Sequence, residues 1–168
     1  HSTGALYTSA LPPSLMRKPF KSAPLLPGSK VRVVSPASSA KENRIARGCQ
    51  NLERLSLRVQ RGPNFKPDGY FAATSQARLA ELQDAIADPQ TRAIFCTRGG
   101  YGSAALLDRL KISPDARPKI ACGFSDVTSL HIFLWQTRGW VTFYGPLVAG
   151  GFDAGPNATC GYDSDSFE

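Results

Sequence analysis

The sequence lacks any apolar run long enough to cross a membrane. Its longest apolar stretches fall far short of the ~18 residues that a membrane span needs, and residues 1–30 lack the continuous apolar core of a secretory signal. Of the 168 residues, 42% are hydrophobic and 20% are charged, which suits one globular domain with a sizeable core. We therefore expect a soluble, cytoplasmic protein with no membrane partner.

Paired cysteines and dense basic runs are also missing. The four cysteines form no C-x-x-C pair and three of them fall on predicted buried faces, which favours free thiols in a reducing compartment over disulfides or a metal site. They are Cys49, Cys96, Cys122 and Cys160. The formal net charge of +7 suits an anionic partner, but the Lys and Arg residues are scattered, without stacking aromatic residues between them. Nucleic acid is therefore not an expected partner.

From Lys30 onward the chain alternates strand and helix patterns. Apolar runs predict strands over 31–35, 57–60, 92–97, 119–124 and 140–144. Apolar residues at helical spacing predict helices within 41–57, from a cap at Ser75 to the Asp-Pro pair at 88–89, over about 104–110 and over 126–138. This alternation predicts an α/β fold: an open, doubly wound, flavodoxin-like and mostly parallel sheet of about five strands, with helices on both faces.

The pattern divides the chain into three segments. Residues 1–29 are expected to be a flexible N-terminal extension, in which the part before the single methionine, Met16, is vector-derived or flexible. Residues 30–146 form the α/β domain. Residues 147–168 are rich in glycine, aspartate and small residues without a period, and we expect them to be a linker toward a domain that the chain does not contain.

The segment GFSDV at 123–127 joins a predicted strand to a predicted helix through a serine. A tight turn there exposes the Ser125 hydroxyl at the sheet edge, where the helix N-terminus also directs free N–H groups that stabilise an oxyanion. The match to the G-x-S-x-G elbow is partial, because Val127 replaces the second glycine. The alternative is that Ser125 or Asp126 is a plain helix cap.

A second loop, RGGYG at 98–102, also lies between a strand end and a helix start. Its glycines, Gly99, Gly100 and Gly102, let the backbone approach a ligand closely, and one N–H group suits a second oxyanion donor. Arg98 either holds a substrate carboxylate or is a surface arginine. A tight turn without a ligand and a phosphate cradle are the alternatives. Neither G-x-G-x-x-G nor a Walker pattern is present, so no nucleotide cofactor is expected.

An attacking serine needs a base, usually a histidine. His1 is terminal, and His131 lies six residues after Ser125 on the following helix, about 240° around and roughly 9 Å along the axis. We therefore interpret His131 as a helix-packing residue, which leaves the serine site incomplete.

Three segments in this order resemble the N-terminal domain of the LD-carboxypeptidases, or murein tetrapeptide carboxypeptidases, whose family includes the microcin C immunity hydrolases. The segments are LAELQDAIADP (79–89), FCTRGGYGSAALLDRL (95–110) and PKIACGFSDVTSLHIFLWQTRGWVTFYGP (118–146). The resemblance covers about Gly28 to Pro146. Ala105 departs from it, because the family often carries arginine there.

The resemblance implies that Ser125 is the nucleophile and that Gly100 and Asp126 give N–H groups to the oxyanion hole, with Arg98 and Gly99 on the substrate side. It implies a histidine base oriented by a glutamate, both from a C-terminal domain, no cofactor and no metal. The substrate would be the murein tetrapeptide, which loses its terminal D-alanine, and family members are commonly homodimers. We expect these 168 residues alone to be inactive.

Three alternatives remain open at this point. One is a microcin-type amide or acyl sulfamate hydrolase of the same family. Another is a non-catalytic module that binds murein peptides or another carboxylate ligand. The third is a flavodoxin-like nucleotide binder with its phosphate at the RGGYG loop.

Overall fold

The computed structural model describes residues 18–63 and 66–166. Five strands form one sheet in the order β2-β1-β3-β4-β5, and every neighbouring pair is parallel. The strands are β1 (Lys30–Val34), β2 (Arg58–Arg61), β3 (Ala93–Cys96), β4 (Ile120–Gly123) and β5 (Phe143–Tyr144). The helices are α1 (Glu42–Arg54), α2 (Ser75–Ala87), α3 (Ala104–Leu107) and α4 (Thr128–Arg138), with the 3₁₀ helices η2 (Ser125–Val127) and η3 (Phe152–Ala154). The predicted fold class is confirmed.

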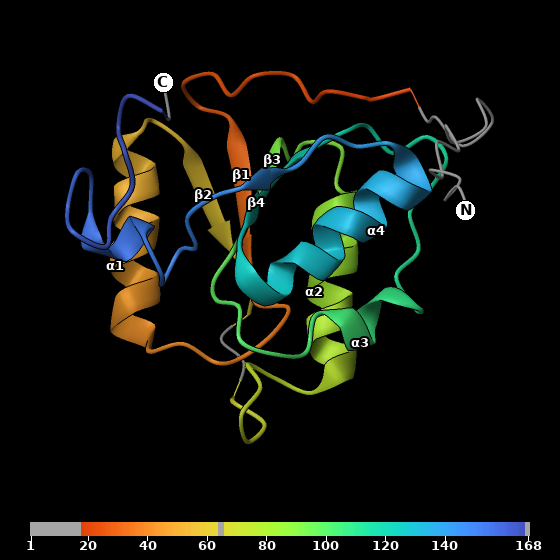
Figure 1. Ribbon diagram of the computed structural model, residues 1–168, viewed down its shortest axis with the longest axis horizontal. Coiled ribbons are helices and arrows are strands. Elements are labelled where there is room, and N and C mark those ends of the chain that lie inside the picture. The colour runs from red at the N-terminus through yellow and green to blue at the C-terminus, as the bar shows by residue number, and fades with distance from the viewer. Residues whose placement is uncertain (1–17, 64–65, 167–168) are drawn as a thin grey trace, which may run out of the picture.

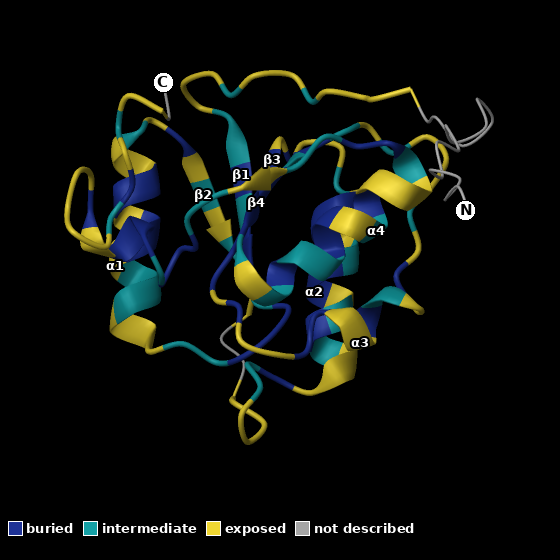
Figure 2. Cartoon of the chain, viewed as in Figure 1, coloured by how far each residue is buried: buried dark blue, intermediate teal, exposed yellow. Residues whose placement is uncertain are grey.

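Both faces of the sheet are covered, which explains why the central strands β3 and β4 are apolar throughout. In Figure 1, α1 and the C-terminal segment lie on one face, and α2, α3 and α4 lie on the other. Ala93 and Phe95 of β3 point into the α1 core, whereas Ile94 and Cys96 point into the core beneath α2 and α4. Figure 2 shows the buried residues along the strands and the inner sides of the helices.

The predicted elements differ from the observed ones mainly at their ends. Thr74, rather than Ser75, is the N-cap of α2, and its Oγ1 accepts the N–H of Ala77 at 3.3 Å. A Thr-Ser pair offers two adjacent caps, so the pattern could not choose between them. The fifth strand shortens from 140–144 to Phe143–Tyr144, because Trp140 turns into the core at 2% exposure.

The C-terminal segment, interpreted from the sequence as a linker, packs on the domain up to Tyr162. Val148 and Phe152 are fully buried and Tyr162 is 7% exposed, all in the core beneath α1. The Asn51 amide of α1 donates to the Phe152 carbonyl at 2.6 Å. This stretch therefore contributes to the hydrophobic core, although its one regular element among the described residues is the short 3₁₀ helix η3.

The N-terminal segment also makes defined contacts where it is described. The Phe20 N–H donates to the Gly139 carbonyl at 2.8 Å, and the Val141 N–H donates to the Phe20 carbonyl at 3.0 Å. Leu25 packs against the α1 core. Met16 and the rest of residues 1–17 lie outside the described residues.

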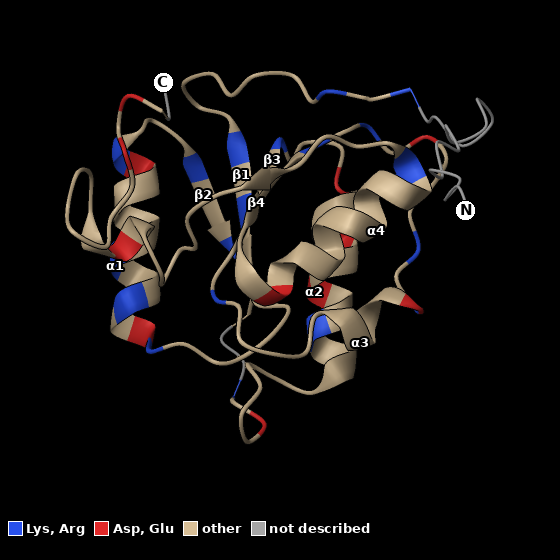
Figure 3. Ribbon diagram, viewed as in Figure 1, with Lys and Arg blue, Asp and Glu red and all other residues tan. Residues whose placement is uncertain are grey.

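Within the described part of the chain, no helix has the length and apolarity needed to cross a bilayer. Cys49, Cys96 and Cys122 are buried, as predicted, and Cys160 is exposed; all four are free thiols. Lys and Arg residues are spread over strands, helices and loops rather than gathered in one stretch (Figure 3).

Candidate active site

Ser125 lies at a strained turn directly after β4. Its φ of +63° is left-handed, a conformation that costs a non-glycine residue about 1–3 kcal/mol. The turn packs tightly, since a methyl group on Gly123 would lie 2.9 Å from Cγ1 of Val127. Val127 itself is fully buried. The side chain that breaks the G-x-S-x-G pattern therefore anchors the turn in the core, while Ser125 stays exposed at the carboxyl edge of the sheet.

The glycine loop after β3 lies against this turn. A methyl group on Gly99 would lie 3.2 Å from Cβ of Ser125 and 3.4 Å from the amide nitrogen of Asp126. Gly100 has a φ of +96°, and a methyl group there would lie 2.3 Å from the Tyr70 hydroxyl. Only glycine fits these two positions without displacing its neighbours. The structure thus brings together the two loops that the sequence singled out.

The two amides named for an oxyanion hole are free to bind a ligand. Neither the Gly100 N–H nor the Asp126 N–H donates a hydrogen bond to another of the described residues. Asp126 lies in the first turn of the η2–α4 helical segment, where backbone N–H groups have no intrahelical acceptor. Such groups can stabilise negative charge on an oxygen placed beside Ser125.

A hydrogen-bond cluster that the sequence did not reveal ties the two loops together. The Ser103 N–H donates to Oδ2 of Asp126 at 2.9 Å, and the Ser103 hydroxyl donates to the Asp126 carbonyl at 2.8 Å. The Ser129 hydroxyl donates to the same carbonyl at 2.9 Å and lies 2.7 Å from Oγ of Ser103. Ser103 is 1% exposed. The carboxylate of Asp126 is therefore used in holding the glycine loop.

Residues after β1 support the glycine loop from its other side. Ser38 is 3% exposed, and its hydroxyl donates to the Gly99 carbonyl at 2.6 Å. The Ser39 N–H donates to the Tyr70 carbonyl at 3.1 Å, which connects the loop after β2 as well. The carboxyl ends of β1, β2, β3 and β4 therefore meet around one site, as expected for an open parallel sheet.

The side chains that face solvent here offer a cation and aromatic rings. Arg98 is exposed and makes no hydrogen bond or ion pair with the described residues. Tyr70 and Tyr101 are 57% and 66% exposed, and each ring contacts that of Phe71. This arrangement leaves the Arg98 guanidinium available for an anionic group.

His131 is a packing residue, as interpreted from its spacing. It is 8% exposed, and its Nε2 lies 2.9 Å from the Gly123 carbonyl, which requires a proton on Nε2. Burial lowers the pKa of His131 and favours the neutral ring. It is also the sole histidine among the described residues. Nor does this part of the chain hold a group of three or more metal-ligating side chains.

Glu81 is a buried carboxyl near this edge, and no sequence pattern singles it out. It is 5% exposed, and its Oε2 accepts the Ser35 N–H at 2.7 Å. Burial raises the pKa of Glu81 to about 7. The Ser35 hydroxyl in turn accepts from Oγ1 of Thr97 at 3.0 Å, which links the ends of β1 and β3.

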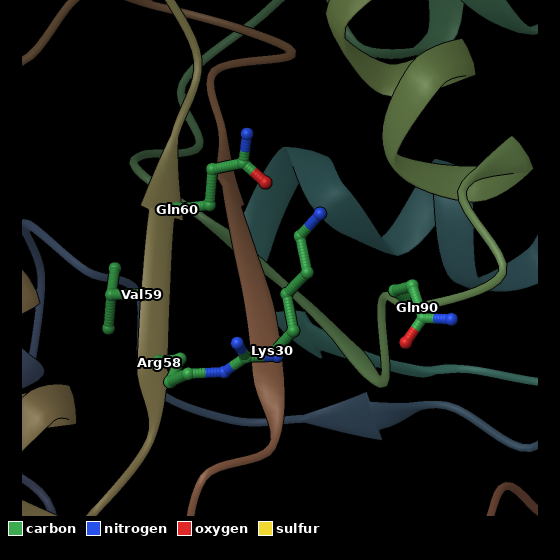
Figure 4. A pocket seen from close by; sticks show the side chains of 5 residues that line it. All are labelled: Lys30, Arg58, Val59, Gln60 and Gln90. Carbon is green, nitrogen blue, oxygen red and sulfur yellow. The ribbon is translucent and has the colours of Figure 1, made fainter.

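A separate polar cavity of about 460 Å³ lies at the opposite edge of the sheet (Figure 4). Lys30 and Arg58, the first residues of β1 and β2, line it with Val59, Gln60 and Gln90. Figure 4 shows the Lys30 and Gln60 side chains on one side of the sheet and Val59 on the other. The cavity is therefore distinct from the serine site at the carboxyl edge.

Comparison with known proteins decides the family. A model of the LD-carboxypeptidase N-terminal domain matches residues 31–145. The chain belongs to the LD-carboxypeptidase family. This family is one of peptidase-type hydrolases, and the resemblance seen in the sequence is confirmed.

The relatives of this chain carry two kinds of name. It is 34% identical over 132 residues to the "Probable murein peptide carboxypeptidase" of Bacillus subtilis, covering 77% of this chain and 41% of the relative. It is 33% identical over 143 residues to the microcin C7 self-immunity protein MccF of Escherichia coli, covering 82% and 42%. The structure of MccF in complex with glutamyl sulfamoyl guanosine superposes with a TM-score of 0.74 at 31% identity, covering 83% of this chain and 43% of that one. The chain therefore spans less than half the length of these relatives.

Proposed function

We propose that this chain is the nucleophile-bearing part of a serine LD-carboxypeptidase that removes the terminal D-alanine of the murein tetrapeptide. The observation that carries the proposal is the strained, exposed Ser125 beside the unoccupied amides of Gly100 and Asp126. Family membership and the murein peptide carboxypeptidase among the relatives support the choice of substrate.

In the proposed reaction, Oγ of Ser125 attacks the carbonyl carbon of the bond to D-alanine and loses its proton to a base. The negative charge that develops on the carbonyl oxygen is stabilised by the N–H groups of Gly100 and Asp126. Collapse of the tetrahedral intermediate breaks the C–N bond and releases D-alanine, whose amine takes up the proton. Water then hydrolyses the ester on Ser125. Arg98 is suited to bind a substrate carboxylate.

The base in this proposal is a histidine oriented by a glutamate in a C-terminal domain. His131 cannot take that role without giving up its hydrogen bond to Gly123 and its place in the core. The relatives extend well beyond the region that this chain matches, which leaves room for both residues. We therefore expect the 168-residue chain to fold without turning over.

The test is D-alanine release from purified murein tetrapeptide by the complete gene product, measured by chromatography. Ser125→Ala should lower the rate by several orders of magnitude, because the nucleophile is lost. Ser113→Ala, which changes an exposed serine before β4, at the opposite end of that strand, is the matched control and should keep the full rate. Unchanged release by Ser125→Ala would refute the assignment.

A second candidate is hydrolysis of a microcin-type amide or acyl sulfamate. The similarity to MccF, about as high as that to the murein peptide carboxypeptidase, favours keeping it. The same Ser125 chemistry would serve both reactions. Parallel assays with an aminoacyl sulfamoyl adenosine and with the tetrapeptide distinguish them, because the preferred substrate should show the higher kcat/KM.

A further inference from the structure

Arg78, in the first turn of α2, is a buried cation that forms no ion pair with the described residues. It is 3% exposed, and no carboxylate among the described residues forms an ion pair with it. Its guanidinium donates instead to the carbonyls of Ala73 at 3.0 Å, Pro36 at 2.5 Å and Gly102 at 3.1 Å. It also lies 4.7 Å from the centre of the Phe71 ring. One side chain thus joins the loops after β1, β2 and β3.

The contact with Gly102 reaches the residue beside the nucleophile through a single peptide group. The Gly102 carbonyl accepts from Arg78, and the N–H of the same peptide, on Ser103, donates to Oδ2 of Asp126 at 2.9 Å. A trans peptide is planar and directs its C=O and N–H in opposite directions. Fixing one end of this peptide therefore fixes the other, and with it the hydrogen bond that orients Asp126.

Gly102 needs this external support. Its φ of +123° lies in a region open to glycine, where the carbonyl can rotate easily. A methyl group there would lie 2.8 Å from Cε1 of Phe71 and 3.1 Å from Nη1 of Arg78, so the loop backbone packs directly on this pair.

We propose that Arg78 is a positioning residue for the oxyanion site: it holds the Gly102–Ser103 peptide so that the amides of Gly100 and Asp126 face the carbonyl that Ser125 attacks. The proposal rests on the proposed function. Stability alone gives little reason for such a residue, because a buried charge pays a desolvation cost that an apolar side chain avoids. Burial lowers the pKa of Arg78, and the negative charges of Asp126 and Asp68 partly oppose this shift; an arginine guanidinium stays charged in proteins.

The first test compares Arg78→Lys and Arg78→Met in the complete gene product. Lysine keeps the charge but cannot bond three carbonyls in a plane, and methionine removes the charge. Both should lower kcat roughly 10- to 100-fold and leave KM within about twofold, because the oxyanion contacts form only in the transition state. Arg78→Lys should be the milder change. A rise in KM with kcat unchanged would overturn the proposal.

Lys119→Met is a matched control for loss of a buried cation. Lys119 is 2% exposed and donates to the carbonyls of Asp88 at 2.7 Å and Thr91 at 2.9 Å, at the amino ends of the strands. Its loss should lower the melting temperature without a selective loss of kcat. An equal fall in kcat for Lys119→Met would show that the Arg78 effect is general destabilisation, and would also overturn the proposal.

Hydrogen exchange provides a readout that does not depend on activity. In Arg78→Lys, the amides of Ser38, Ala72 and Ser103 should exchange at least about tenfold faster, whereas in Lys119→Met they should keep the wild-type rate. If Arg78→Met does not fold, Phe71→Leu loosens the same contact and should speed the same amides. Unchanged exchange of these amides in Arg78→Lys would overturn the proposal. If these amides exchange faster in Arg78→Lys but the wild-type gene product hydrolyses neither substrate, only the proposed function is refuted.

Discussion

At the scale of single residues, Ser125 is held in a conformation that its own side chain disfavours. With a φ of +63° it occupies a position that glycine would take at lower cost. Natural proteins keep such strain where it serves function, because evolution has selected activity over stability there.

This strain makes a prediction about stability. Ser125→Gly should raise the free energy of unfolding by about 1 kcal/mol relative to Ser125→Ala, because glycine relieves the left-handed backbone and alanine does not. Both variants lack the hydroxyl and should be equally inactive. Urea denaturation of the two proteins measures the difference. Equal stabilities would contradict the strain seen at Ser125.

The raised pKa of Glu81 leads us to expect that the stability of the protein depends on pH. Its pKa is about 7 in the folded protein and near 4.5 when unfolded, so the folded protein binds an extra proton between these values. Its contribution to stability therefore falls as pH rises from about 4.5 to about 7.

Glu81→Gln should remove that fall while keeping an acceptor for the Ser35 N–H. The difference in unfolding free energy between variant and wild type should grow by about 3 kcal/mol from pH 4 to pH 8. His131, whose lowered pKa has the opposite effect, is present in both proteins and cancels in the difference. Urea denaturation of both proteins at several pH values measures this difference. If the difference in unfolding free energy does not change with pH, Glu81 is not the source of the pH dependence.

The residue scale also shows what a sequence can and cannot reveal. Ser125, Gly99 and Gly100 stand out because each sits at the junction of a strand and a helix, a local pattern. Arg78 and Ser103 do not stand out, since the hydrogen bonds that join them to Pro36, Gly102 and Asp126 span 23 to 42 positions in the chain. No periodic or local signal encodes such a contact.

At the scale of elements, the order and type of the strands and helices followed from apolar patterning. The strand predicted over 140–144 was the least accurate of the five, because β5 lies at an edge of the sheet and keeps only Phe143 and Tyr144. Edge strands are buried less completely, so the burial that shapes their sequence is weaker. The C-terminal segment could not be predicted at all, since Val148 and Phe152 are buried without any repeat.

Phe152 in η3 tests whether that segment belongs to the core. It is fully buried and its ring lies 5.4 Å from that of Phe95 and 4.9 Å from that of Tyr162. Phe152→Ala should cost about 3–5 kcal/mol of unfolding free energy, as for other large core side chains. Tyr144→Ala, at a 72% exposed aromatic residue, is the control and should cost less than about 1 kcal/mol. If Phe152→Ala lowers the unfolding free energy as little as Tyr144→Ala does, residues 147–162 act as a linker rather than as part of the core.

At the scale of the whole molecule, the described residues include an exposed serine, Ser125, and two amides that make no hydrogen bond with other described residues, at Gly100 and Asp126, but no exposed histidine. The chain matches less than half the length of these relatives, and its proposed nucleophile, Ser125, lies exposed at the carboxyl edge of the sheet. We infer that the complete site is assembled when a second domain brings a base to this edge.

The central claim is that Ser125 is the nucleophile of that assembled site. The most direct measurement treats the complete gene product with a fluorophosphonate and locates the adduct by peptide mass mapping, while D-alanine release is followed in the same sample. We predict a single adduct on Ser125, formed in proportion to the loss of D-alanine release, and none in Ser125→Ala. Continued D-alanine release by a protein fully modified at Ser125, or loss of release with Ser125 unmodified, would contradict the account.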